Sequence, residues 1–151
     1  MSTAYTSNYL NITSTDLTAT LWCEDVIPQP VVLQNFAPDQ SFVLEEVTVA
    51  EGQMGVDGGY AAGFIPTPKK LSMYLMANSP SKQHLDAIYS AFTTNRSTYR
   101  ITITITLPST GERYIFSNGT MLTSNPMSSP KKVLDGTTWK FEFASLEIEK
   151  I

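Results

Sequence analysis

Apolar and polar residues alternate most regularly between Thr98 and Leu107. The odd-numbered positions from Tyr99 to Leu107 are all apolar, whereas the even-numbered ones from Arg100 to Thr106 are polar. A strict period of two over ten residues predicts a β-strand with one buried face. The turn residues Pro108–Gly111 follow, so we expect Arg113–Phe116 to return as the partner strand of a hairpin.

Shorter apolar patterns predict further strands at Asp16–Trp22, Val31–Phe36, Ser41–Val49, Leu71–Met76 and Thr138–Ile148. Prolines flank Val31–Phe36, which favours an edge position for that strand. The apolar positions change parity at Glu45-Glu46, which indicates a bulge or a crossing between sheets. They change again at Ala144-Ser145, where we expect a second bulge.

A helix is predicted from about Pro80 to Phe92, with Ser79 as its N-cap and Asn95 as its stop. Its apolar stripe consists of Leu85, Ile88, Tyr89 and Phe92. With strands elsewhere, this predicts a mainly β fold: an antiparallel β-sandwich or barrel with one appended α-helix.

The chain of 151 residues is expected to form one domain over residues 1–151. Two stretches follow neither period and are predicted as long loops, residues 51–64 and residues 118–136. The first contains five glycines between Glu51 and Gly63. Long loops on a compact β domain often mediate interactions.

Composition excludes several classes of protein. Apolar residues make up 42% and charged residues 16% of the chain, which is unlike a disordered acidic tail, a coiled coil or a collagen repeat. The net charge of −4 supplies no basic face for duplex DNA. The apolar runs are too short to cross a bilayer, and Met1–Leu10 has no signal-peptide pattern, so we expect synthesis in the cytoplasm and no membrane anchor.

Residues for catalysis or metal binding are sparse. Cys23 and His84 are each the only residue of their kind, which excludes an intramolecular disulfide and a multi-histidine zinc site. The acidic pairs Glu24-Asp25 and Glu45-Glu46 are adjacent in sequence, so on a strand their carboxylates would point to opposite faces. Asp57-Gly58-Gly59 is typical of a turn. We therefore predict no enzyme: no catalytic, cofactor-binding or metal-binding residues, and no cofactor.

The aromatic residues leave a second interpretation open. They could form a sugar-stacking platform, as in a carbohydrate-binding β-sandwich module of a receptor-binding apparatus, or they could pack in cores and subunit interfaces. The tyrosines and tryptophans in question are Tyr5, Tyr9, Tyr60, Tyr74, Tyr89, Tyr99, Tyr114, Trp22 and Trp139.

The long, nearly uncharged strand Thr98–Leu107 has edges that a stable monomer would need to protect. Pairing with neighbouring subunits in a closed ring is one way to protect them. The glycine-rich stretch would then be an arm that becomes ordered on assembly.

The order of these features resembles the short tail-tube-type structural proteins of contractile-tailed bacteriophages. The resemblance covers nearly the whole chain. It is carried by Asp16–Leu21, Glu46-Val47 leading into Met54–Gly59, the strand Leu71–Met76, the helix start Asn78-Ser79-Pro80, the stripe from Leu85 to Tyr89, and Gly136-x-x-Trp139-Lys140-Phe141-Glu142-Phe143 entering a strand that ends at Ile148.

The resemblance implies a β-sandwich or barrel related to the type VI secretion tube protein. It implies stacked hexameric rings around a channel that conducts phage DNA without sequence-specific binding. Strands Thr98–Leu107 and Thr138–Ile148 would form the ring, and Glu51–Phe64 would reach the adjacent ring. Partners would be further copies of the chain and tail proteins such as the sheath, the baseplate hub or the tape measure, in a virion tail assembled in the host cytoplasm.

Two stretches are longer than a minimal tube subunit needs, Val26–Pro38 and Asn125–Lys132. They leave open a specialised ring at one end of the tube: a baseplate tube initiator, an adaptor or a tail terminator.

Overall fold

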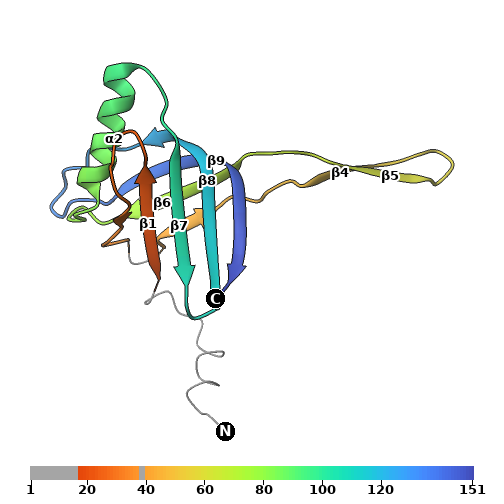
Figure 1. Cartoon of the computed structure of the whole chain (residues 1–151), viewed down its shortest axis with the longest axis horizontal. Helices are drawn as coiled ribbons and strands as arrows, with labels where there is room; N and C mark the ends of the chain where they lie inside the picture. Colours follow the sequence, from red (N-terminus) through yellow and green to blue (C-terminus); the bar gives the residue numbers. More distant parts are fainter. Residues whose placement is uncertain (1–16, 38–39) are drawn as a thin grey trace, which may run out of the picture.

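The computed structural model describes residues 17–37 and 40–151, which form a curved antiparallel sheet, a helix and a projecting two-stranded arm (Figure 1). Within these residues the sheet has seven strands in the order β2-β1-β7-β8-β9-β6-β3, while β4 and β5 pair with each other. The elements are β1 (Thr18–Cys23), β2 (Val31–Val32), β3 (Phe42–Leu44), β4 (Ala50–Met54), β5 (Tyr60–Phe64), β6 (Lys69–Leu75), α2 (Lys82–Asn95), β7 (Ile101–Leu107), β8 (Glu112–Ser124) and β9 (Thr137–Lys150). This confirms the predicted mainly β fold with one appended helix.

The core lies on one face of the sheet because the strands alternate as the sequence predicts. Ile101, Ile103 and Ile105 of β7 are buried, and the threonines between them are half-buried on the other face. From β9, Trp139, Phe141 and Phe143 are fully buried on the core face. The predicted hairpin is present, but β8 continues to Ser124 rather than ending near Phe116.

Helix α2 packs on this core through Leu85 and Ile88, which are both fully buried. Phe92 follows on the same stripe, and its ring lies 5.6 Å from that of Tyr99. Tyr89 was predicted for the apolar stripe but is exposed. It directly follows Ile88, so its side chain points about 100° around the helix from the buried one.

The start of the helix differs from the prediction. The helix begins at Lys82 after the N-cap Ser81, and no side-chain hydrogen bond caps it. Ser81 and the predicted N-cap Ser79 instead bind the segment after β2. The Ser79 hydroxyl donates to the Gln34 carbonyl, and the Gln34 N–H donates to Ser81 Oγ at 2.7 Å. The helix ends at the predicted Asn95.

The first predicted parity change marks a crossing between sheets rather than a bulge, because the chain passes there from the seven-stranded sheet to the two-stranded arm. Strand β3 stops at Leu44, and the Glu45 N–H makes one more bond to the Lys70 carbonyl at 3.0 Å. The chain then leaves the seven-stranded sheet and enters the arm. Val47 and Val49 are therefore not part of β3.

The second parity change is real, but β9 contains no bulge at Ala144-Ser145. The register between β8 and β9 is continuous from Glu112↔Lys150 to Met121↔Phe141. The irregularity lies in β8 where it pairs with β7, close to Asn118, whose φ of 56° is left-handed. One displaced residue in β8 changes the buried parity there, and β9 follows it through the shared register.

The prediction of a long loop is wrong for residues 51–64 and partly wrong for residues 118–136. Residues 51–64 are a β-hairpin rather than a flexible loop. Of residues 118–136, the first seven belong to β8, so the loop there spans residues 125–136.

Candidate assembly surfaces

The arm is a regular hairpin that extends away from the sheet (Figure 1). Its strands pair from Ala50↔Phe64 to Met54↔Tyr60. The Gly55 N–H donates to the Gly59 carbonyl at 2.7 Å, and the Gly59 N–H donates to Asp57 Oδ1 at 3.0 Å. Gly58 has a φ of 87°, which favours glycine. Asp57-Gly58-Gly59 is a hairpin signal in the sequence, and together with the segments on either side of it this signal indicates the arm.

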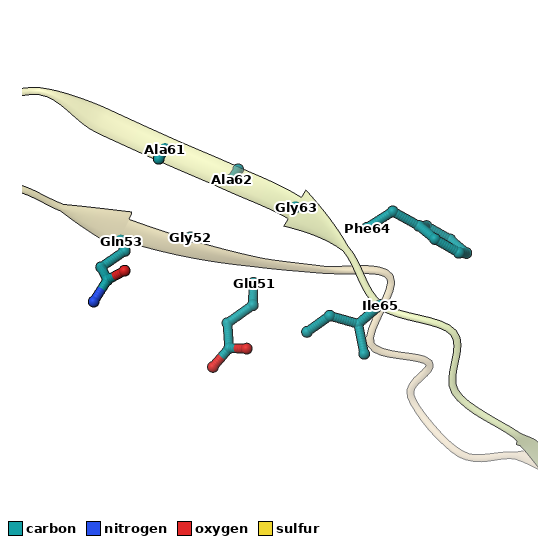
Figure 2. A pocket seen from close by; sticks show the side chains of 8 residues that line it. All are labelled: Glu51, Gly52, Gln53, Ala61, Ala62, Gly63, Phe64 and Ile65. Atoms are coloured by element: carbon teal, nitrogen blue, oxygen red, sulfur yellow. The ribbon is translucent and has the colours of Figure 1, made fainter.

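The two faces of the arm differ in chemistry. Paired residues share a face and successive residues alternate, so Met54, Tyr60 and Phe64 lie on one face, called here the apolar arm face, together with Ala50, Gly52 and Ala62. Glu51 and Gln53 project from the opposite face (Figure 2).

Tyr60 explains why a glycine occupies position 52. A Cβ atom at Gly52 would lie 1.9 Å from the Tyr60 hydroxyl oxygen. The Tyr60 side chain therefore lies across Gly52, its diagonal neighbour on the apolar arm face. Any larger residue at position 52 would move this ring.

The apolar arm face is open to solvent. Met54 is 65%, Tyr60 67% and Phe64 78% exposed, and all ten strand residues of the arm are exposed. A two-stranded hairpin is at best marginally stable alone in water, and an exposed cluster of large apolar residues marks an interaction site. The arm has the properties of a surface that becomes buried in an assembly.

The two chain segments at the base of the arm are bonded to each other. The Ile65 N–H donates to the Val49 carbonyl at 3.0 Å, and Thr67 Oγ1 donates to the Thr48 carbonyl at 2.6 Å. Lys69 Nζ donates to the Ala144 carbonyl of β9 at 3.2 Å. The paired ribbon therefore continues below Ala50 and Phe64, and the Lys69 bond joins β6 to β9 next to it.

A second candidate surface is the unpaired edge of β9. Strand β6 pairs with β9 only as far as Lys69↔Phe143, whereas β8 continues to Glu112↔Lys150. Within the described ranges, no strand therefore pairs with the other edge of β9 beyond Phe143, although Lys69 bonds Ala144 there. An unpaired edge offers backbone N–H and C=O groups to another chain.

The strand faces expected to build a ring are polar. Thr102, Thr104 and Thr106 of β7 are half-buried on the face away from the core and pair with Trp22, Thr20 and Thr18 of β1. Further along the same face, Arg113 of β8 forms an ion pair with Glu149 of β9 at 3.5 Å.

The residues considered for catalysis are dispersed. The Cys23 thiol is buried, and desolvation raises its pKa, which keeps it protonated and unreactive. His84 is half-buried on α2, beside a shallow depression lined by Val26 and Ile27. Both acidic pairs are exposed. Among residues 17–37 and 40–151, no cluster of three or more His, Cys, Asp or Glu could hold a metal ion.

The aromatic residues are divided among separate elements. Trp139 is fully buried, Tyr60 lies on the arm, Tyr89 on α2, and Tyr114 donates a 3.0 Å hydrogen bond to Glu112. Tyr5 and Tyr9 lie outside the described residues. None of the helices found in the described part of the chain is long and apolar enough to span a membrane.

The exposed apolar arm and the unpaired edge of β9 are therefore the two surfaces of the described residues that could receive a partner. A family model described as "Tail fiber protein gp32" matches residues 10–147, and the chain belongs to this family. The family is one of structural tail proteins rather than enzymes, which agrees with the prediction from the sequence. No curated protein sequence matches the chain.

Solved structures with a similar fold come from contractile injection systems. A chain of the PVC sheath–tube complex in the extended state is 11% identical and has a TM-score of 0.65, with 100% of this chain and 99% of that chain covered. A chain of the PVC sheath/tube terminator is 10% identical with a TM-score of 0.63, covering 92% and 96%. A chain of the anti-feeding prophage baseplate is 14% identical with a TM-score of 0.53, covering 89% and 92%. At these identities the similarity establishes the fold, and with the family it confirms the resemblance to tail tube-type proteins.

Proposed function

We propose that this protein is the structural subunit of a phage tail tube and assembles, as a single domain over residues 1–151, into stacked hexameric rings around a channel for DNA. The observation that carries the proposal is the exposed apolar arm on a tube-like fold. A fold that aligns with a tube-complex chain over its full length supports the ring, and an arm that leaves the sheet supports contact with an adjacent ring.

The edge of β9 supports closure of the ring. Its outer backbone groups beyond Phe143 are available to a strand of the neighbouring subunit. Main-chain pairing of this kind needs little side-chain specificity and removes an edge that would otherwise promote aggregation. Each subunit would thereby extend one sheet into the next.

The charge of the chain suits a channel for DNA. The net charge is −4, and a lumen without a basic surface does not retain a polyanion. DNA therefore passes without sequence-specific binding. Sheath, baseplate hub and tape measure proteins are the expected neighbours in the tail, which forms in the host cytoplasm.

A specialised ring at a tube end is the second candidate. The TM-score with a chain of the sheath/tube terminator is 0.63, nearly as high as the value of 0.65 with a chain of the sheath–tube complex. An initiator, adaptor or terminator would use the same subunit architecture but would stop after one ring.

Negative-stain microscopy of the purified protein over a concentration series tests the proposal. Long hollow tubes are the expected result, and single rings that never stack would favour the tube-end role. A protein that stays monomeric in solution and also fails to join purified tail assemblies would refute both.

The arm can be removed cleanly to test its part. Val49 and Ile65 already form an antiparallel pair at its base, so replacing residues 50–64 with Asn-Gly should close the ribbon with a two-residue turn. We expect a folded subunit with an unchanged far-ultraviolet spectrum that no longer stacks. Tubes of normal length from this variant would exclude the arm from ring-to-ring contact.

A further inference from the structure

An apolar hollow opens at the end of the domain opposite α2, where the curved sheet brings β3 and β6 toward β1, β7 and β8. Its volume is about 460 Å³, within the range of sites that receive a ligand or a large side chain. The residues that line it are Leu17, Gln40, Ser41, Phe42, Leu44, Leu71, Ile105, Leu107, Tyr114 and Phe116.

The hollow carries almost no charge. Its side chains are aliphatic, aromatic or neutral polar, and the Tyr114 hydroxyl is already satisfied by its 3.0 Å bond to Glu112. A charged partner would lose hydration here without a compensating ion, so the hollow selects an apolar, uncharged occupant.

The apolar arm face meets this requirement. Met54, Tyr60 and Phe64 form an exposed uncharged row, whereas the acidic Glu51 projects from the opposite face and Asp57 sits in the turn. The arm extends away from its own sheet (Figure 1), so it does not cover the hollow of its own chain.

We propose that the apolar arm face of one copy docks into the hollow between β3 and β8 of another copy. This inference rests on the proposed function and adds the acceptor site for the arm. Because donor and acceptor are different surfaces of the same chain, every copy provides one of each. Such a heterologous contact repeats from copy to copy, which is what stacking requires.

Two adjacent residues of β3 provide a matched test. Leu44 is 39% exposed and lines the hollow, whereas its neighbour Val43 is 37% exposed and lies on the other face of the strand. Leu44→Asp places a charge in the hollow, and we expect it to raise the concentration needed for assembly at least tenfold. Val43→Asp should assemble like the natural protein. Equal assembly by both variants would overturn the docking site.

Cross-linking gives a second readout that does not depend on the stability of the charged variant. A tagged Phe64→Cys chain is mixed with an untagged Leu44→Cys chain and treated with a short bifunctional maleimide. We expect a covalent dimer that contains both chains, and none when Val133→Cys, on the 125–136 loop, replaces Phe64→Cys. The unsubstituted protein is treated in the same way, to show that the buried Cys23 forms no cross-link.

The outcomes separate the two proposals. Assembly without the Phe64–Leu44 cross-link would overturn the docking site but leave the tube subunit in place. If the unsubstituted protein neither assembles in solution nor joins purified tail assemblies, both proposals are overturned. If maleimide labels Leu44→Cys in the monomer only after residues 2–16 are deleted, the amino-terminal segment of the same chain fills the hollow, and the docking site is again overturned.

Discussion

Truncating the most exposed aromatic side chain of the arm should weaken assembly and leave the subunit intact. Phe64 is 78% exposed in the isolated subunit, so Phe64→Ala removes few contacts there. Substitutions of this kind change the free energy of unfolding by no more than about 0.5 kcal/mol. In an assembly that buries the arm, the same side chain contributes the hydrophobic free energy of its burial.

The size of the effect follows from the exposed fraction. Fully burying a Phe side chain contributes about 1.5–3 kcal/mol, and the fraction still exposed in the subunit is 78%. The loss per contact is therefore about 1–2 kcal/mol. Since about 1.4 kcal/mol corresponds to a factor of ten, the association constant should fall roughly five- to thirtyfold.

Sedimentation measures this change as the critical concentration for assembly. Adding one subunit forms one arm contact, so the critical concentration of Phe64→Ala should rise about five- to thirtyfold. Val133→Ala is the matched control because Val133 is equally exposed, at 79%, but lies outside the arm. An unchanged critical concentration for Phe64→Ala would refute the burial of the arm on assembly.

Two further predictions concern the subunit itself. Gly119→Ala should lower the free energy of unfolding by about 2–4 kcal/mol in urea titrations, because its Cβ would lie 2.5 Å from the Glu142 carbonyl oxygen and 2.2 Å from the Phe143 ring. Gly63→Ala is the control and should be neutral, because a Cβ at position 63 meets no atom within 4 Å. Equal stability of the two variants would contradict the close packing of β8 on β9. The pKa of the Cys23 thiol is raised by burial, so iodoacetamide should alkylate it slowly at pH 8 in the folded protein and rapidly in urea. Rapid alkylation of the folded protein would show instead that the thiol is accessible. Because the folded state holds the thiol proton more tightly than the unfolded state, the contribution of Cys23 to stability should fall as the pH rises above the ordinary thiol range.

The strands of the seven-stranded sheet were largely predictable. The alternation from Ile101 to Leu107 and the aromatic positions Trp139, Phe141 and Phe143 correctly identified the core face, because burial of one face imposes a period of two on the sequence. The lengths were less predictable. Strand β8 runs eight residues beyond Phe116. Pairing with β9 as far as Ser124, and with β7 only as far as Gly119, maintains a strand that its own polar sequence does not indicate.

The arm was not predictable from the alternation of apolar residues, for a related reason. Its residues have no buried face in the subunit, so neither strand shows the apolar alternation that marks a half-buried sheet. Gly52 and Gly63 also disfavour strand structure locally. Backbone pairing across the Asp57–Gly59 turn determines the hairpin, and this pairing is visible only when both strands are considered together.

By itself, the sequence determined the class of fold, the face of each main strand that enters the core, and the likeness to tail tube-type proteins, because these depend on local period and on the order of motifs. The tertiary structure alone decided that residues 51–64 form a projecting arm, that β9 keeps an unpaired edge, and that Leu44 and Tyr114 line one hollow. The arm depends on backbone pairing across its own turn, whereas the edge and the hollow depend on contacts between residues far apart in the chain. Such contacts follow from sheet curvature and strand register, which no single segment encodes.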